Sequence, residues 1–126
     1  MQPTFSFEHV VAWQKAHHFT VLVYQITQDF PKEEMFGLTS QFRRAAISIE
    51  ANIAEGYKKL SKADKLRFLN ISEGSLAECR NYILLSRDLG FLNENQYQQL
   101  YDYIEDTSKL LTAYSKGIIN NNGIKD

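Results

Sequence analysis

Six polar side chains stand where helical segments would otherwise be apolar. They are Arg44, Ser48, Asn52 and Glu55 in one segment, and Ser75 and Glu78 in another. The first four recur at spacings of four, four and three residues, so a helix would place them on one face. The other two interrupt an apolar row. Their chemistry is that of a hydrogen-bonded network that contains one cation and two carboxylates.

A buried polar group without a partner costs about 1–3 kcal/mol, so these side chains should satisfy one another. We predict an interhelical network in which Arg44 bonds Glu55 or Glu78, with Asn52 and Ser75 completing it. Three interpretations remain open at this point. The network fixes helix register and subunit pairing, or the row is a solvated face, or it lines a ligand or catalytic pocket.

A second group that could do chemistry is a cluster of cations. It consists of Lys58, Lys59, Lys62, Lys65 and Arg67. Only Asp64 opposes them, so the segment carries 5 − 1 = +4 while the whole chain carries −1. Tyr57 and Phe68 flank the cluster. Such a segment could contact the phosphates of a nucleic acid, or it could be a solubilising loop.

The residues needed for common catalytic and metal sites do not occur in the required patterns. Histidine occurs only at positions 9, 17 and 18. His17 and His18 diverge by about 100° around a helix, and no Glu-x-x-His pair of a di-metal bundle is present. There is no glycine-rich phosphate loop, nucleophile elbow or Cys-x-x-Cys motif. Cys79 lies in an apolar row, where a thiol is inert. We therefore expect no catalytic residues, no metal, no cofactor and no enzymatic activity.

Length and composition limit the remaining possibilities. A chain of 126 residues, 44% hydrophobic and 23% charged, suits one globular domain over 1–126. The single cysteine excludes an internal disulfide and fits a reducing compartment. No stretch approaches the ~18 consecutive apolar residues of a membrane span, and the first residues do not resemble a signal peptide. The expected location is the cytoplasm, without a membrane partner.

Apolar residues recur at three- and four-residue steps in four segments, which predicts four helices. Their approximate ranges are 7–28, 37–56, 62–89 and 93–119. Ser6, Ser61 and Asn93 are suitable N-caps, with Asp64 and Gln96 completing capping-box patterns for the last two. Gly56 and Gly90 are suitable stops for the second and third helices.

Short connections make successive helices antiparallel neighbours, so the predicted fold is an all-α, up-down-up-down four-helix bundle. The third helix carries two rows rather than one. The first is Leu69, Ser72, Leu76, Cys79 and Ile83, and the second is Phe68, Ile71, Ser75, Glu78, Tyr82, Leu85 and Leu89. One row suffices for a corner of a bundle. The second row predicts that another subunit covers this helix.

Several sequence runs are similar to those of a bacterial helical-bundle family. The most specific is Arg-Arg-Ala-Ala-Ile-Ser-Ile-Glu-Ala-Asn-Ile-Ala-Glu-Gly at 43–56, supported by the runs at 11–16, 36–41 and 74–78. They resemble the proteins encoded in intervening sequences of bacterial 23S ribosomal RNA genes, often labelled as a ribosomal protein family. They are also similar to the accessory protein of diversity-generating retroelements. The resemblance covers about residues 5–115.

This resemblance implies a four-helix bundle that assembles into a homopentameric ring, in a setting near RNA or a reverse transcriptase and without established catalysis. The motif positions are the six residues of the polar row together with Gly56. Glu50 stands where the family often has proline, so we expect a less kinked second helix. The expected function is a non-enzymatic, homo-oligomeric accessory or scaffold protein for an RNA or a nucleic-acid-processing enzyme. The alternatives are a protein-interaction module without a nucleic-acid role, and a small-ligand binder or enzyme that uses the polar row.

Overall fold

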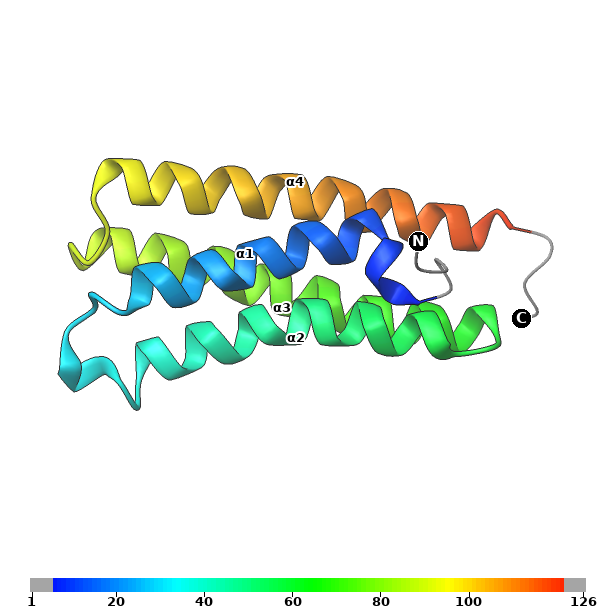
Figure 1. Ribbon diagram of the computed structural model, residues 1–126, viewed down its shortest axis with the longest axis horizontal. Helices are drawn as coiled ribbons and strands as arrows, with labels where there is room; N and C mark the ends of the chain where they lie inside the picture. The colour runs from blue at the N-terminus through cyan, green and yellow to red at the C-terminus, as the bar shows by residue number, and fades with distance from the viewer. Residues whose placement is uncertain (1–5, 122–126) are drawn as a thin grey trace.

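The computed structural model describes residues 6–121, and its elements are all helical. They are the short 3-10 helix η1 (Phe7–His9), α1 (Val11–Thr27), the 3-10 turn η2 (Lys32–Glu34), α2 (Leu38–Lys58), α3 (Lys62–Asp88) and α4 (Glu94–Ile119). The four α-helices run side by side along the long axis of the molecule (Figure 1). The predicted all-α four-helix class is confirmed.

Each long helix packs against two others, in the pairs α1 with α2, α2 with α3, α3 with α4 and α1 with α4. The helices therefore form a four-cornered bundle, with α1 diagonal to α3 and α2 diagonal to α4. The α2–α3 turn lies at one end of the bundle, and the α1–α2 and α3–α4 connections lie at the other (Figure 1). Successive helices are antiparallel because their connections are short.

The predicted capping residues lie where the helices begin and end. The Ser61 hydroxyl accepts a hydrogen bond from the Asp64 backbone N–H at the start of α3. Asn93 and Gln96 form a reciprocal capping box at the start of α4. Gly90 follows α3 with φ = +79°, a backbone conformation that favours glycine. Local side-chain hydrogen bonds thus explain where α3 and α4 begin, and the glycine conformation explains where α3 ends.

Two boundaries differ from the prediction. The first helix is not continuous from residue 7, because Val10 is extended (φ −72°, ψ 118°) between η1 and α1. This break lets the Phe7 ring pack edge-on against Trp13, with ring centroids 5.1 Å apart. The second helix does not stop at Gly56 but continues to Lys58. Gly56 is instead buried inside α2, where its missing side chain leaves room for α3.

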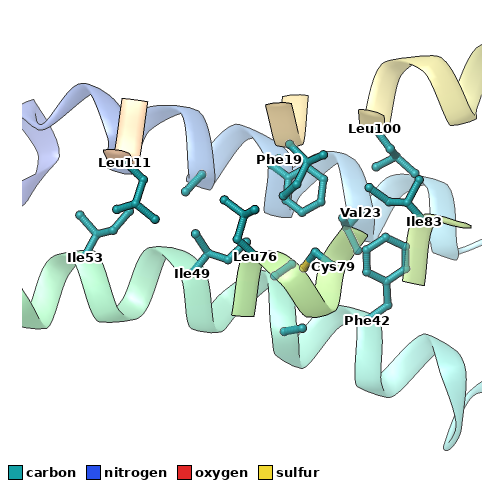
Figure 2. Close-up of a cluster of buried hydrophobic side chains, with 14 of the residues drawn as sticks. Phe19, Val23, Phe42, Ile49, Ile53, Leu76, Cys79, Ile83, Leu100 and Leu111 are labelled. Atoms are coloured by element: carbon teal, nitrogen blue, oxygen red, sulfur yellow. The ribbon is translucent and has the colours of Figure 1, made fainter. Parts of the chain in front are cut away.

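A single cluster of buried hydrophobic side chains runs along the bundle and receives residues from all four helices. Figure 2 shows side chains from the facing helices meeting between the ribbons, with Phe19 and Val23 from α1 and Phe42 from α2 among them. Cys79 lies fully buried in this cluster, as the sequence predicted for a small hydrophobic residue. Burial of this apolar surface is the main stabilising term of the fold.

The two rows of α3 have different environments. The whole first row is buried in the core. In the second row Ser75 is buried against α2, but Ile71, Leu85 and Leu89 are 44%, 42% and 51% exposed. The isolated chain therefore leaves an apolar strip of α3 uncovered, on the side that the sequence assigned to a second subunit.

Candidate functional site

The polar row is divided between the seam of α2 and α3 and the outside of the bundle. Ser75 donates a hydrogen bond to the Ser48 hydroxyl across the seam, at 2.7 Å. The Asn52 side-chain amide donates to the backbone carbonyl and the hydroxyl of Ser48, at 2.9 and 3.1 Å. These three residues form a small interhelical network, in which buried Ser75 is satisfied. Its role in setting helix register stays a prediction.

The other three residues of the row do not join this network. Arg44, Glu55 and Glu78 are exposed, and the predicted bond from Arg44 to Glu55 or Glu78 is not formed in the described chain. Their side chains extend into solvent, whereas Ser48 and Ser75 meet at the seam. The Tyr82 hydroxyl donates to Glu78 at 3.5 Å. Burial, with Glu78 as a second cause, raises the pKa of Tyr82, and Arg44 opposes this shift.

Together with nearby exposed residues, these side chains form what we call the outer face of α2 and α3. It comprises Arg44, Ile47, Ala51 and Glu55 of α2, and Ile71, Gly74, Glu78 and Leu85 of α3. Each set follows helical steps of three, four or seven residues and therefore lies on one side of its own helix. The two sides adjoin, because Arg44 of α2 and Glu78 of α3 both influence the pKa of Tyr82. A Cβ atom built on Gly74 meets nothing within 4 Å, so the surface is open there. The outer face combines uncovered apolar side chains with charges of both signs.

Ser72 is a further polar residue at the seam. Its burial could have been predicted from its position in the apolar row of α3, but its hydrogen-bond partner could not. Ser72 is fully buried, and its hydroxyl donates to the Ile49 carbonyl of α2 at 2.8 Å. A serine in an apolar row signals a buried hydroxyl. The carbonyl that accepts its bond depends on how the two helices pack.

The cations at the α2–α3 turn, which we call the basic end, are engaged to different degrees. Lys65 donates to the Tyr57 carbonyl at 2.8 Å and to the Gly56 carbonyl at 3.5 Å, which satisfies carbonyls at the end of α2. Burial lowers the pKa of Lys65. The Lys62 ammonium donates to the Ile119 carbonyl of α4 at 3.1 Å. These two lysines therefore tie the ends of α2, α3 and α4 together.

The remaining cations lie nearer the surface. The Lys59 ammonium and the Arg67 guanidinium both lie over the Phe68 ring, at 4.9 and 4.8 Å from its centroid. Arg67 also approaches Asp64 at 3.4 Å, in an exposed ion pair of small energetic value. Lys58 is exposed. The basic end thus keeps its positive charge, with three cations held close to solvent.

His17 and Cys79 are arranged as structural residues. The His17 ring stacks on Trp13 at 4.8 Å between centroids, and its Nδ1 lies 3.0 Å from Glu50 of α2. Among residues 6–121, no group of three or more histidine, cysteine, aspartate or glutamate side chains is placed to hold a metal ion. Burial strongly raises the pKa of the Cys79 thiol, which keeps it protonated and unreactive.

A groove between α3 and α4 contains a carboxylate that the sequence did not single out. Its volume is about 600 Å³. It is lined by Leu66, Arg67, Leu69, Asn70 and Glu73 of α3 and by Thr112, Ser115, Lys116 and Ile119 of α4. The Glu73 Oε1 atom is buried and has no hydrogen-bond partner among the described residues. Burial raises the pKa of Glu73, and nearby Arg80 only partly offsets this. A lone glutamate in a helix gives no sequence signal of such a position.

With this geometry established, the chain can be compared with known proteins. The profile of the 23S rRNA-intervening sequence protein family matches residues 8–113. The chain belongs to this family. A crystal structure of a protein of unknown function from the S23 ribosomal protein family of Bacteroides thetaiotaomicron is similar to this chain, with a TM-score of 0.77 and 26% identity. The similarity covers 84% of this chain and 96% of that one.

No curated protein matches this chain, and neither the matching family nor the similar structure indicates a catalytic family. The matched segment contains the outer face and the basic end, whereas the groove extends beyond it to Ile119. Within the part of the chain that the structure describes, no helix has the length and apolar character needed to cross a membrane. Family membership confirms the resemblance found in the sequence.

Proposed function

We propose that this chain is a non-enzymatic accessory protein that assembles with copies of itself through the outer face of α2 and α3, and that its basic end contacts RNA. The observation that carries the proposal is the composition of the outer face. Ile47, Ile71 and Leu85 are each more than 40% exposed there. Covering them would remove apolar surface from water, which favours association.

A second copy of the chain suits this face better than an unrelated apolar partner. Arg44 brings a positive charge, and Glu55 and Glu78 bring negative charges, without ion pairs to one another or to other described residues. Another part of the surface of a copy also carries exposed apolar side chains, such as Val11 and Leu84, together with charges of both signs, so it can cover the apolar residues and pair the charges. Gly74 lets a neighbouring chain approach the α3 backbone closely. From the family resemblance we expect five copies in a ring, in which each contact joins two different surfaces.

Light scattering on the purified protein tests the assembly. We expect a mass of about five times the 14.6 kDa of one chain. Ile71→Asp should shift this mass towards one chain, because it buries a charge in the contact. Val21→Asp is the matched control, since Val21 is 43% exposed on α1 while Ile71 is 44% exposed. A monomeric wild-type protein, or equal effects of the two variants, would reject the outer face as the contact.

Contact with RNA is supported by the positive charge of the basic end and by the family to which the chain belongs. If phosphates bind there, the logarithm of the affinity should fall linearly with the logarithm of salt concentration. Reversing the charge at Lys58 and Lys59 should weaken binding several-fold and reduce that slope. Reversing it at Lys32 and Lys109, two exposed lysines away from the basic end, makes the same change in net charge and serves as the control.

The alternative is a protein-interaction module without a nucleic-acid role. An assembled protein that binds no RNA at low salt would favour this alternative. So would RNA binding that is equally weakened by both pairs of charge reversals, because it would then depend only on net charge.

A further inference from the structure

The aromatic residues of the basic end are poorly placed to recognise bases. Stacking on an aromatic ring is the usual way in which single-stranded RNA bases are held. Both Lys59 and Arg67 already lie over Phe68, and Tyr57 is approached by the His9 ring and the Lys65 ammonium. This end therefore offers charge to the phosphates and leaves base contacts to another surface.

The α3–α4 groove adjoins the basic end and has the features of a base site. Arg67 belongs to both, and the bond from Lys62 to the Ile119 carbonyl joins the basic end to the groove wall. Its volume of about 600 Å³ is within the range of small-ligand sites, and it is open to solvent along one side. A nucleotide that is part of a longer chain could therefore enter from the side.

The interior of the groove holds an acceptor that lacks a donor. The Glu73 Oε1 atom is buried without a hydrogen bond, although a buried acceptor normally finds one. Arg80 interacts with this carboxylate only through its charge, because its Nη2 atom lies 2.8 Å from Glu105 and its Nε atom is buried without a hydrogen-bond partner among the described residues. The groove therefore favours a ligand that presents N–H donors to this carboxylate.

The edge of the groove provides charges of the opposite kind. Arg67 and Lys116 are exposed on the two sides, one on each helix. The Lys116 ammonium makes no ion pair or hydrogen bond with another described residue, and the contact of Arg67 with Asp64 is long and exposed. The apolar side chains of half-buried Leu66 and buried Leu69 also line the groove. Cations, apolar side chains and an unpartnered acceptor in one groove match a phosphate, a flat ring and a donor edge.

We propose that the α3–α4 groove binds one guanine nucleotide unit, with the base against Leu66 and Leu69, its N–H edge on Glu73, and its phosphate between Arg67 and Lys116. Guanine is the base with two adjacent N–H donors on its pairing edge, which a carboxylate can accept together. The unit belongs to an RNA chain or to a free nucleotide, which share this chemistry. The proposal rests on the proposed RNA contact and assigns a base preference to it.

Calorimetric titration of the intact protein with 5′-GMP, 5′-UMP and two pentanucleotides tests the groove. One pentanucleotide is all uridine, and the other has guanosine at its centre. A good match between N–H donors and a carboxylate distinguishes bases by about tenfold or more in affinity. GMP should therefore bind at least about tenfold more tightly than UMP, and the guanosine-containing pentanucleotide more tightly than the all-uridine one by the same factor. If only GMP and not the guanosine-containing RNA shows the preference, the groove is a free-nucleotide site.

Variants assign the contacts. Glu73→Gln should remove the guanine preference. Asp106→Asn also removes one carboxylate charge, but Asp106 lies on α4 outside the groove lining, so this variant should keep the preference. Lys116→Gln should weaken the binding of GMP but not that of guanosine, which has no phosphate. Ser115→Trp should fill the groove and block the binding of both ligands. Circular dichroism checks that each variant is folded. The proposal is overturned if GMP and UMP bind equally, or if neither binds.

The test separates this inference from the proposed function. Salt-dependent RNA binding together with equal binding of GMP and UMP would overturn the groove but leave the basic end as the RNA contact. Absence of RNA binding together with absence of any preference for GMP would overturn both.

Discussion

Replacing Gly56 with alanine tests whether the close approach of α2 and α3 is as tight as the structure shows. A Cβ atom at this position would lie 3.2 Å from the Lys65 carbonyl oxygen and 3.2 Å from the Phe68 Cβ, and 3.7 Å from the Leu69 side chain. The Lys65 oxygen is a backbone atom and the Phe68 Cβ is bonded to the backbone, so neither can move without shifting α3. The first turn of α3 also contains the lysine that satisfies carbonyls at the end of α2.

Two opposing terms set the size of the effect. Alanine in a helix is favoured over glycine by about 1 kcal/mol. Overpacking a well-packed contact costs about 1–3 kcal/mol. Gly56→Ala should therefore change the free energy of unfolding by between about 0 and −2 kcal/mol. Gly117→Ala has nothing within 4 Å of its new Cβ and should gain up to about 1 kcal/mol.

Urea unfolding followed by circular dichroism measures both variants, at one protein concentration because assembly adds to apparent stability. The expected difference between Gly117→Ala and Gly56→Ala is about 1–3 kcal/mol, with the second variant the less stable. If Gly56→Ala were as stable as Gly117→Ala, the two helices would not be in close contact at this position, and Gly56 would be only the helix stop that its sequence position suggests.

Further predictions concern two titratable groups, Glu73 and Cys79, whose pKa values are raised by burial. Because burial raises the pKa of Glu73, the folded state binds its proton more tightly than the unfolded state. Its contribution to stability is present below the ordinary glutamate pKa and is lost as pH rises through the raised value, so Glu73→Gln should remove this loss in urea unfolding measured across that range. A variant with unchanged pH dependence would argue against a buried carboxylate. Cys79 is buried with a raised thiol pKa, so a thiol-specific reagent should modify it only after unfolding in urea, at least tenfold faster than in the native protein. Fast labelling of the native chain would contradict its core position.

Much of the fold could be predicted because the information is local. The three-and-four periodicity of apolar residues located the four helices, and Ser61, Asn93 and Gly90 located three of their ends. The errors have tertiary causes. At Val10 the chain departs from helical geometry where Phe7 packs against Trp13. At Gly56 a residue that commonly ends helices instead lies where another helix passes.

The candidate sites could be predicted only in outline. Spacing placed the polar row within an arc of about 80° on one side of α2, and such an arc can span the border between a seam and a solvent face. Ser48 therefore meets Ser75, while Arg44 and Glu55 do not meet their predicted partners. Charge counting found the basic end, yet Lys65 proved to be bound to backbone carbonyls.

The sequence by itself determined which segments are helical, which residues cap them, and how charge is distributed along the chain, because these properties depend on neighbours within about one helical turn. Only the tertiary structure decided which polar residues share a partner, which glycine admits another helix, and that Glu73 lies beside a groove without a donor. Those outcomes depend on the rotation and spacing of each helix, and all four helices set these together when they fill one core.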